Sequence, residues 1–325
     1  MMRRLLCWAA LLPMLLSCVA GRAQAVPLDL AGYIDDAGAI TIQSKGATID
    51  PYFTLQALLL AQEHGLDISR EAARWTEWLM PRQKPDGTFD RFCRQGVAWA
   101  PCKTADADDS QLALWLKFLE TNPAELKRNP AWQKSHASAR QSLKRLEDKG
   151  RGIYIVSPVY LHGLFMDNLE VWSYAPARAG VQTPGQPDFG RTLHKVFWDE
   201  GTKRYHVSTQ LEQRTAETAF YPDAVAQIFP LLVKFPHIPG GDQAWYAQWM
   251  KRHRAEWLTQ VKTDFAWGLV AVVALDQNDK LAARCWLRTA LPARHGPHWT
   301  VTDEVAAQIL KSKSVAPADA RESCQ

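Results

Sequence analysis

"PYFTLQALLLAQEHGLDISREAARWTEWLMPRQ", residues 51–83, contains two helical segments of different character, joined by a short turn around Gly65. The first segment, 51–64, is apolar over most of its length, whereas the second, 69–83, mixes apolar and charged residues at helical spacing. A helix that is apolar on all sides is buried, and an amphipathic helix covers one side of a core. This stretch therefore predicts a helical hairpin with an inner and an outer member.

The same hairpin pattern recurs along the rest of the chain. Further pairs are predicted at 109–120 with 130–148, 167–180 with 187–199, 222–235 with 241–258, and 264–277 with 279–291, and a last helix at 302–312 begins a sixth pair. The first member is again the more apolar one, as in LALWL and WGLVAVVAL. Repeated helix pairs without a parallel-strand pattern predict an all-α array.

Short extended pieces separate the pairs, at 84–92, 150–161 and 202–210, and their turn residues favour strands or hairpins in loops at one end of the molecule. Buried inner helices surrounded by amphipathic outer ones favour a closed arrangement. We therefore predict an all-α (α/α)6 barrel, or toroid, of helical hairpins with short β-hairpin loops at one rim. The alternative is an open helical solenoid.

The first 25 residues have the pattern of a signal peptide. Arg3 and Arg4 precede an apolar run over 5–16, and the segment ends in Ala23-Gln24-Ala25. We predict cleavage and export to the periplasm or the exterior, with a lipobox that ends at Cys18 as the less favoured alternative. No later stretch is long and apolar enough to be a transmembrane span. The predicted parts are a signal peptide (1–25), an extended N-terminal segment (26–49), the toroid domain (50–312) and a flexible C-terminal tail (313–325).

The basic balance of the chain comes largely from the leader. The formal net charge of +4 falls to +1 once Arg3, Arg4 and Arg22 are removed, and no Lys/Arg-rich block remains. This pattern excludes nucleic acid as an expected partner.

Four cysteines follow the leader: Cys93, Cys102, Cys285 and Cys324. Export permits disulfides, and Cys93 and Cys102 bracket a loop-like stretch, so we predict a disulfide there in preference to a zinc site, for which no nearby histidine pair exists. Cys285 lies in a helical pattern and is predicted to be a buried thiol. No metal is expected, since the histidines show no ligand-like pairing on a helix, and no cofactor is expected, since the chain lacks a P-loop and a dinucleotide fingerprint.

Acidic residues open every predicted inner helix. They are Asp50, Asp108 with Asp109, Asp167, Asp223, Asp264 and Asp303. In a closed toroid the inner helices are parallel, so these side chains meet at the rim that carries the extended loops. Helix capping is the simpler explanation for any one of them, above all for Asp50, which precedes Pro51.

The segment TADADDSQ, 104–111, holds more charge than a cap needs. Asp106, Asp108 and Asp109 lie within four positions, and repulsion among them raises at least one pKa if they are partly buried. A cationic ligand, a hydroxyl-rich ligand or a proton would offset that cost. Together with Asp167 on the next inner helix, Asp109 forms the carboxylate pair that glycoside cleavage requires.

We predict Asp109 and Asp167 as the acid–base pair, with Asp106 or Asp108 orienting the sugar. The predicted substrate-binding residues also include Asp50, Glu170, Asp223, Trp99, Tyr154, Trp172, Tyr221 and Trp267. The aromatic members are drawn from a chain with 14 Trp, and their flat faces suit sugar rings, although helix packing is the alternative role for most of them.

Three segments resemble the six-hairpin glycosidase superfamily: DADDSQLALWL (106–116), GIYIVSPVYLHGLFMDNLEVW (152–172) and AFYPDAVAQIFPLL (219–232). The resemblance implies an (α/α)6 toroid in which acids at the inner-helix N-termini line a sugar-binding cleft and carry catalysis. The DAD of 106–108 is similar to the Asp-Ala-Asp segment of family 8 glycoside hydrolases, where an Asp binds the central sugar. Asp50 stands where that family has a Glu general acid.

The leading functional hypothesis is an exported glycoside hydrolase-like protein acting on a poly- or oligosaccharide by carboxylate acid–base catalysis. The second is a non-catalytic polysaccharide-binding or scaffold protein of a polysaccharide export machinery. The third is a class II terpene cyclase-like protein, because DADD resembles the Asp-x-Asp-Asp motif of those enzymes and QKPDGTF (83–89) resembles their repeat units. The sequence makes no prediction of the saccharide or the oligomeric state.

Overall fold

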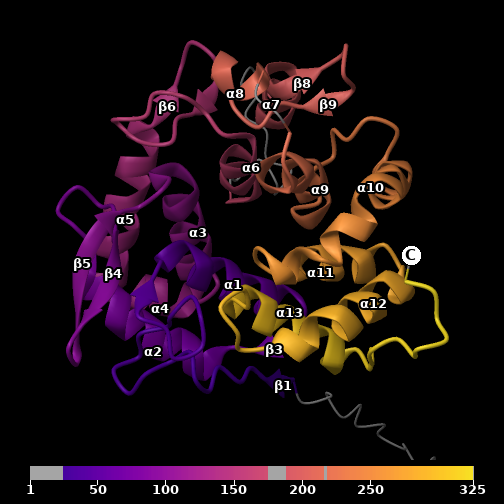
Figure 1. The fold of residues 1–325 in the computed structure, drawn as a ribbon. Coiled ribbons are helices and arrows are strands. Elements are labelled where there is room, and N and C mark those ends of the chain that lie inside the picture. The colour runs from indigo at the N-terminus through magenta and orange to yellow at the C-terminus, as the bar shows by residue number, and fades with distance from the viewer. Residues whose placement is uncertain (1–24, 175–187, 216–217, 325) are drawn as a thin grey trace, which may run out of the picture.

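Six inner helices form a closed ring in the computed structural model, which describes residues 25–174, 188–215 and 218–324 (Figure 1). They are α1 (Pro51–Glu63), α3 (Asp108–Glu120), α6 (Phe165–Tyr174), α9 (Val225–Leu232), α11 (Gly268–Asp276) and α13 (Val301–Ser312). Each contacts the next, and α13 packs against α1. The predicted all-α toroid is therefore confirmed, and the open solenoid is excluded because the last inner helix meets the first.

The outer helices follow the inner ones along the chain. They are α2 (Ser69–Leu79), α5 (Pro130–Arg145), α7 (Phe189–Phe197), α10 (Asp242–Trp257) and α12 (Lys280–Ala290). The predicted asymmetry between inner and outer members is present: α11 is buried from Gly268 to Ala274, whereas α2 buries one side through Trp75, Trp78 and Leu79. Gly268 is needed where α11 crosses α13, since a Cβ there would lie 2.7 Å from the Ala306 side chain.

Short strands occupy the loops between the helices. They are β1 (Val26–Pro27), β2 (Thr48–Ile49), β3 (Leu66–Asp67), β4 (Asp90–Gln95), β5 (Ala98–Thr104), β6 (Glu147–Asp148), β7 (Ile153–Tyr154), β8 (Trp198–Asp199) and β9 (Arg204–Tyr205). β1 pairs with β3 in parallel, β2-β4-β5 form an antiparallel sheet, and β6-β7 and β8-β9 are hairpins.

Several boundaries differ from the predicted ones. Helix α11 begins at Gly268, four residues later than predicted, because Trp267 has a left-handed backbone with φ of 53°. The helix predicted at 222–235 is shorter: its first three residues belong to a π-helical turn, η3 (Phe220–Ala224), and α9 spans Val225–Leu232. Two short helices, α4 (Pro123–Arg128) and α8 (Leu211–Thr215), were not predicted. The predicted helical residues 175–180 and 187 lie outside the described chain, as does the signal peptide apart from Ala25.

The four cysteines that follow residue 25 form two disulfides. Cys93–Cys102 joins β4 to β5, which confirms the predicted bond, although the residues between them form a hairpin and not a loop. The buried thiol predicted at Cys285 is wrong, because Cys285 is bonded to Cys324. The C-terminal tail runs back over α12, where the Ala318 amide donates to the Arg284 carbonyl. A buried position on this helix is therefore in contact with the tail.

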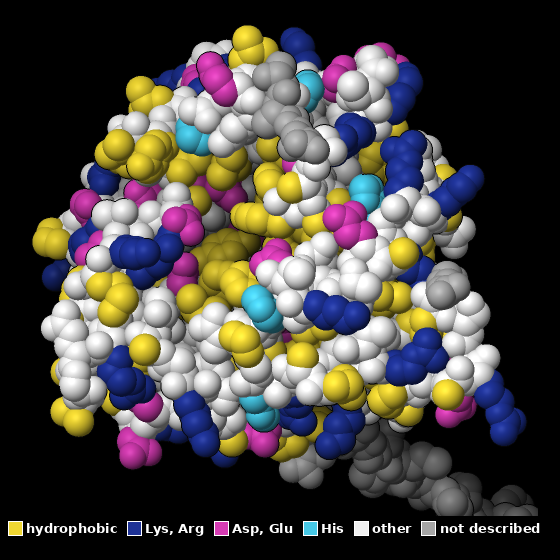
Figure 2. Space-filling model, in the orientation of Figure 1, with side chains coloured by type: hydrophobic (Ala, Val, Ile, Leu, Met, Phe, Trp, Pro, Cys, Tyr) yellow, Lys and Arg dark blue, Asp and Glu magenta, His cyan; other side chains and the backbone are white. Residues whose placement is uncertain are grey.

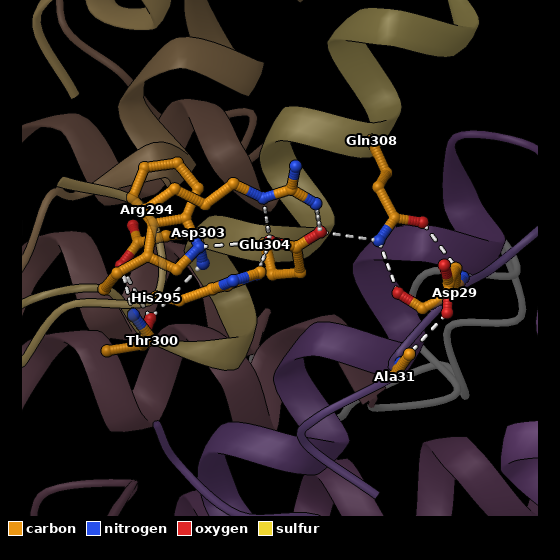
Figure 3. A network of polar contacts seen from close by, with 9 residues as sticks. Asp29, Ala31, Arg294, His295, Thr300, Asp303, Glu304 and Gln308 are labelled. Atoms are coloured by element: carbon orange, nitrogen blue, oxygen red, sulfur yellow. Dashed lines mark hydrogen bonds and ion pairs between the residues drawn. The ribbon is translucent and has the colours of Figure 1, made fainter. Parts of the chain in front are cut away.

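No outer helix follows α13 in the described chain, and N-terminal residues pack against it instead. The amide of Val301 donates to the Ile42 carbonyl (2.7 Å), and Gln308 exchanges two hydrogen bonds with the Asp29 backbone. Figure 3 shows Glu304 at the centre of this network, accepting from Gln308 and from Nε and Nη2 of Arg294. These contacts hold the closing helix of the ring to the first described residues.

Candidate active site

A cavity of about 490 Å³ lies at the end of the ring where the inner helices begin. Residues at the start of all six inner helices, or just before them, line it. Figure 2 shows this hollow in the middle of the face, with hydrophobic side chains on its floor and acidic side chains near its edge. The ring therefore brings helix N-termini that are far apart in sequence to one shared space.

Five carboxyl side chains line the cavity: Asp50, Asp106, Asp167, Asp264 and Asp303. Four of them are among the acids predicted from the helix starts, and Asp106 lies two positions before the first residue of α3. Arg91, on β4, is the one lysine or arginine among the described residues that line it.

Asp109, Asp167 and Glu170 form a buried carboxyl cluster between α3 and α6. Asp109 has no exposed surface, and its two oxygens lack a hydrogen-bond partner of good geometry within the described chain. Asp167 is 9% exposed and lines the cavity, while its buried Oδ2 likewise has no partner. Glu170 accepts from the Tyr52 hydroxyl (2.9 Å) and the Gln56 amide (3.3 Å) through Oε1, and its Oε2 is unpartnered.

Burial dominates the protonation of this cluster. It raises the pKa of Asp167 to about 7. Burial, followed by the charge of Asp167, raises the pKa of Glu170 to about 8. The pKa of Asp109 is raised well above its usual value by burial and by repulsion from Asp167. Since charged carboxylates without a cation are costly in a buried site, the cluster holds protons at neutral pH.

A second group, Asp50, Arg91 and Asp106, connects the starts of α1 and α3. Asp50 caps α1 through the Tyr52 amide (3.0 Å), and its Oδ2 lies 3.1 Å from the Arg91 Nε. The same guanidinium forms an ion pair with Asp106. Burial raises the pKa of Asp50 while Arg91 opposes the shift. Asp50 is therefore both the predicted cap and a residue of the cavity wall.

Asp303 has a structural role. Its carboxylate accepts from the Gly268 amide (2.7 Å), the Thr300 amide (2.9 Å) and the Thr300 hydroxyl (2.8 Å), which completes a capping box on α13 and satisfies the start of α11. Burial raises its pKa to about 6. Asp264 is half-buried and accepts one bond, from the Trp267 indole at 3.3 Å.

Aromatic rings form the other side of the cavity mouth. Tyr221 stacks on Trp267 with ring centroids 5.1 Å apart, and its ring is half-exposed. Phe53 meets Phe265 edge-on at 5.7 Å. Burial of its hydroxyl, then the charges of Asp167 and Glu170, raise the pKa of Tyr221 to about 12. Two predicted aromatics, Tyr221 and Trp267, thus lie at the cavity.

The other predicted aromatics are placed elsewhere. Trp99, on the β4–β5 hairpin, donates to Asp35 (2.7 Å). Tyr154 packs edge-on against Phe189, and Trp172 packs edge-on against Phe235 in the core. None of the three lines the cavity. Their alternative role in packing is the one observed, because hairpin and helix positions turn these rings toward neighbouring elements.

Four of the predicted acids lie outside the cavity lining: Asp108, Asp109, Glu170 and Asp223. Asp108 is influenced by Lys84, Asp86 and Asp90, and burial raises its pKa to about 6. Asp223 accepts from the Ala219 amide (3.0 Å), and its other oxygen lies 3.7 Å from Arg204.

Sequence analysis missed several polar residues of the cavity wall, among them Tyr52, Gln56, Arg91, Ser110 and Gln111. A polar residue inside an apolar inner helix was a usable signal for Gln56 and Gln111. Tyr52 and Gln56 are four residues apart and share one helix face. Arg91 gave no such signal, since its position depends on the pairing of β4 with β2.

Within the described ranges, no group of three or more His, Cys, Asp or Glu side chains is arranged to hold a metal ion. None of the helices described is long and apolar enough to cross a membrane.

Solved structures share the fold. A protein described as a novel alpha-amylase from Clostridium perfringens superposes with a TM-score of 0.53 at 10% identity, over 86% of this chain and 93% of that one. An uncharacterized conserved protein from Thermus thermophilus superposes with a TM-score of 0.51 at 12% identity, over 87% and 97%. These two likenesses show that the chain shares the fold of both proteins, in agreement with the predicted toroid.

A mannosylglycerate hydrolase of Thermus thermophilus aligns with a TM-score of 0.42 at 13% identity, over 86% of this chain and 97% of that one. No protein-family model matches the chain. A search of curated proteins also finds no match.

Proposed function

We propose that this chain is an exported glycoside hydrolase that acts on a poly- or oligosaccharide by carboxylate acid–base catalysis. The observation that supports this most is Asp167, a carboxyl on the wall of an enclosed cavity, whose pKa of about 7 keeps part of the population protonated at neutral pH. Aromatic rings on the cavity mouth suit a sugar face, and two disulfides suit an oxidising compartment outside the cytoplasm.

Asp167 is assigned as the general acid. It gives its proton to the glycosidic oxygen as the bond from that oxygen to the anomeric carbon breaks. Asp109, the partner predicted from the sequence, has no exposed surface and lies outside the cavity lining, so it cannot touch a sugar there. It is assigned instead as a positioning residue behind Asp167, whose charge adds to burial in raising the pKa of the Asp109 carboxyl.

Asp264 is assigned as the general base. Arg91 forms ion pairs with Asp50 and Asp106, and a backbone amide donates to Asp303. Besides Asp167, Asp264 is therefore the cavity-lining carboxyl with few polar contacts, since it accepts a single hydrogen bond. Asp264 precedes α11, whereas Asp167 lies on α6. In the ring, α9 lies between these two helices. Asp264 accepts a proton from the water whose oxygen bonds to the anomeric carbon.

Reducing-end release from a panel of polysaccharides tests this assignment. We expect product from the native protein, and a loss of about 10²-fold or more in Asp167→Asn and in Asp264→Asn. Asp223→Asn is the matched control, because Asp223 also opens an inner helix but does not line the cavity. Full activity in both Asp→Asn variants would overturn the assigned roles.

The same panel distinguishes the second candidate, a non-catalytic polysaccharide-binding or scaffold protein of an export machinery. The complete burial of Asp109 favours this candidate, since one of the two predicted catalytic carboxyls is out of reach of a ligand. Saturable binding without new reducing ends, unchanged in Asp167→Asn, would select it.

A terpene cyclase-like activity is favoured by one observation, the apolar floor of the cavity, to which Met166, Phe229 and Leu269 contribute lining. Of the three acids in the DADD segment, however, Asp106 alone lines the cavity, and it is paired with Arg91. Cyclised product from a prenyl diphosphate, with no release of reducing ends, would select this candidate.

A further inference from the structure

Much of the cavity lining is apolar and accessible. Phe53, Leu164, Met166 and Phe265 line the cavity and are each half-buried, so part of every one of these side chains remains open. Figure 2 shows hydrophobic side chains on the floor of the hollow. Apolar surface in contact with water is unfavourable, and in a concave site it favours a ligand that covers it with an apolar group of its own.

The two carboxyl groups assigned to catalysis lie nearer the mouth than the floor does. Asp264 precedes α11 and Asp167 is close to the start of α6, whereas Phe229 lies a full turn into α9, about 6 Å along the helix from its first residue. At similar depth on α1, the Gln56 amide donates to the Tyr52 hydroxyl (3.0 Å). A sugar ring held between the two carboxyls therefore leaves apolar lining beneath it.

The two sides of the cavity present different kinds of apolar group. Trp267, on the side of Asp264, belongs to the aromatic stack at the mouth, whose flat rings suit the face of a sugar. Leu164 and Met166, which flank the buried start of α6 beside Asp167, are aliphatic and adapt to an apolar group of irregular shape. Because Asp167 protonates the glycosidic oxygen, the group beyond that oxygen lies on the aliphatic side.

The size of the cavity limits that group. An apolar cavity of about 150 Å³ holds a benzene ring, so a volume of about 490 Å³ has room for a sugar ring together with an aryl group or a short alkyl chain. The hollow is open at the face of the molecule, so further sugar units extend outward from the mouth.

We propose that the saccharide cleaved in this cavity ends in an apolar aglycone, an alkyl or aryl group that enters first and covers the floor. The proposal rests on the proposed function and narrows its substrate to an oligosaccharide linked to such a group. Asp167 gives its proton to the aglycone oxygen as the bond from that oxygen to the anomeric carbon breaks. The hydroxyl of water bonds to that carbon, and the second proton of the water goes to Asp264. The products are a free reducing end and an alcohol or phenol.

Calorimetry of the native protein with 1-thioglycosides tests the proposal, since sulfur in place of the glycosidic oxygen resists cleavage. The probes are methyl, butyl and hexyl 1-thioglycosides of glucose, galactose and mannose in both anomeric forms, a disaccharide of each sugar, its 6-O-hexanoyl ester, and 1-hexanol. We expect affinity to rise about two- to fourfold per methylene group, and so more than about thirtyfold from methyl to hexyl. The heat capacity change of binding should become more negative along the series.

Variants of the aliphatic side provide the second readout. Leu164→Asn and Met166→Gln keep the approximate size of each side chain, and either should reduce hexyl binding by about tenfold while methyl binding changes by less than about twofold. Met166→Gln decides the question if Leu164→Asn does not fold. Leu161→Asn is the matched control, because Leu161 lies in the same segment but is exposed and outside the cavity lining, and it should keep the full chain-length dependence.

The outcomes separate the two proposals. Affinity that does not rise with chain length, or a disaccharide bound as tightly as the hexyl glycoside, would overturn the aglycone proposal and leave a saccharide site in place. Tighter binding of the 6-O-hexanoyl sugar than of the hexyl glycoside would also overturn it, because the apolar group would then lie elsewhere on the sugar. If 1-hexanol binds as tightly as the hexyl glycosides, or if no probe binds, the proposed function fails together with it.

Discussion

Glu170 illustrates at the residue scale how burial changes a carboxyl group. The side chain is 2% exposed, donors reach one of its oxygens, and burial raises its pKa from 4.5 to about 8. A carboxyl that keeps its proton in the fold but loses it in the unfolded chain makes folding less favourable as pH rises. The acid cluster therefore reduces the stability of the fold at neutral pH.

The first prediction concerns Glu170→Gln. Because the folded-state pKa is raised, the stability linked to Glu170 is present in full below about 4.5 and is lost as pH rises toward 8. Each pKa unit corresponds to about 1.4 kcal/mol, so the variant should be more stable than the native protein by roughly 2–4 kcal/mol at pH 8 and by about 1 kcal/mol or less at pH 5. Chemical denaturation at the two pH values measures this.

Glu77→Gln serves as the control, since Glu77 is exposed on α2 and should show the same small effect at both pH values. A Glu170→Gln variant that is destabilised more at pH 8 than at pH 5 would mean that Glu170 is ionised in the fold.

The second prediction concerns the pH dependence of activity under the proposed function. If Asp167 is the acid, kcat/KM should fall about tenfold per pH unit above pH 7, because its pKa is about 7 and only the protonated form can act. This alkaline limb of the pH profile reflects the coupled titration of the whole cluster. Its apparent pKa therefore describes Asp109, Asp167 and Glu170 together. A pH profile of Asp223→Asn should keep this limb, and a flat alkaline limb in the native protein would rule out Asp167 as the acid.

At the scale of the elements, helix starts are fixed by short polar contacts. Asp303 caps α13 and also satisfies the first amide of α11, so one carboxylate joins two neighbouring inner helices. Helix ends were predicted closely from the sequence, as at α1, α5 and α13, because caps and apolar spacing are local signals. The β4–β5 hairpin was missed in part, because the alternation of apolar and polar residues in its two strands is weak.

The third prediction is that Asp303→Ala destabilises the protein by about 2–4 kcal/mol, since it removes a cap and leaves buried amides at Gly268 and Thr300 without an acceptor. Thr300→Val should cost about 1 kcal/mol, because the Asp303 carboxylate still reaches the Thr300 amide. Urea unfolding measures both. Asp242→Ala, at the exposed start of α10, should change stability by less than about 1 kcal/mol.

The fourth prediction compares the two disulfides. Cys93 and Cys102 are nine positions apart, and Cys285 and Cys324 are 39 apart, so loop-closure entropy predicts stabilisation of about 2–3 and about 4 kcal/mol. Unfolding of the Cys93→Ala/Cys102→Ala and Cys285→Ala/Cys324→Ala variants without reductant should show this order. The reverse order would mean that the tail remains ordered over α12 without its bond.

At the scale of the whole molecule, closure of the ring depends on segments outside the hairpins. Leu28, Leu30, Tyr33 and Ile40 are buried although they precede the first helix, and Ile42 hydrogen-bonds the start of α13. The N-terminal segment covers α13 in the absence of an outer helix there. Stability of the cavity is therefore linked to residues that contribute little to its wall.

The fifth prediction is that Leu30→Ala lowers the stability of the whole ring by about 2–5 kcal/mol, because Leu30 has no exposed surface. Circular dichroism and tryptophan fluorescence should report one shared unfolding transition at lower denaturant. Val26→Ala is the control, since Val26 is 52% exposed and should be nearly neutral. Two separate transitions in Leu30→Ala would show that the N-terminal segment folds independently of the ring.

The sequence by itself determined the helical hairpins, their inner and outer members, and the end of the ring at which acidic residues gather, because these depend on apolar spacing and on caps within one or two turns. Tertiary structure alone decided which acids reach the cavity. Successive residues of a helix point about 100° apart, so Asp108 and Asp109 at one helix start face different neighbours, and neither lines the cavity. The rotation of each helix about its own axis is set by packing around the closed ring, and that packing places Asp167 on the cavity wall.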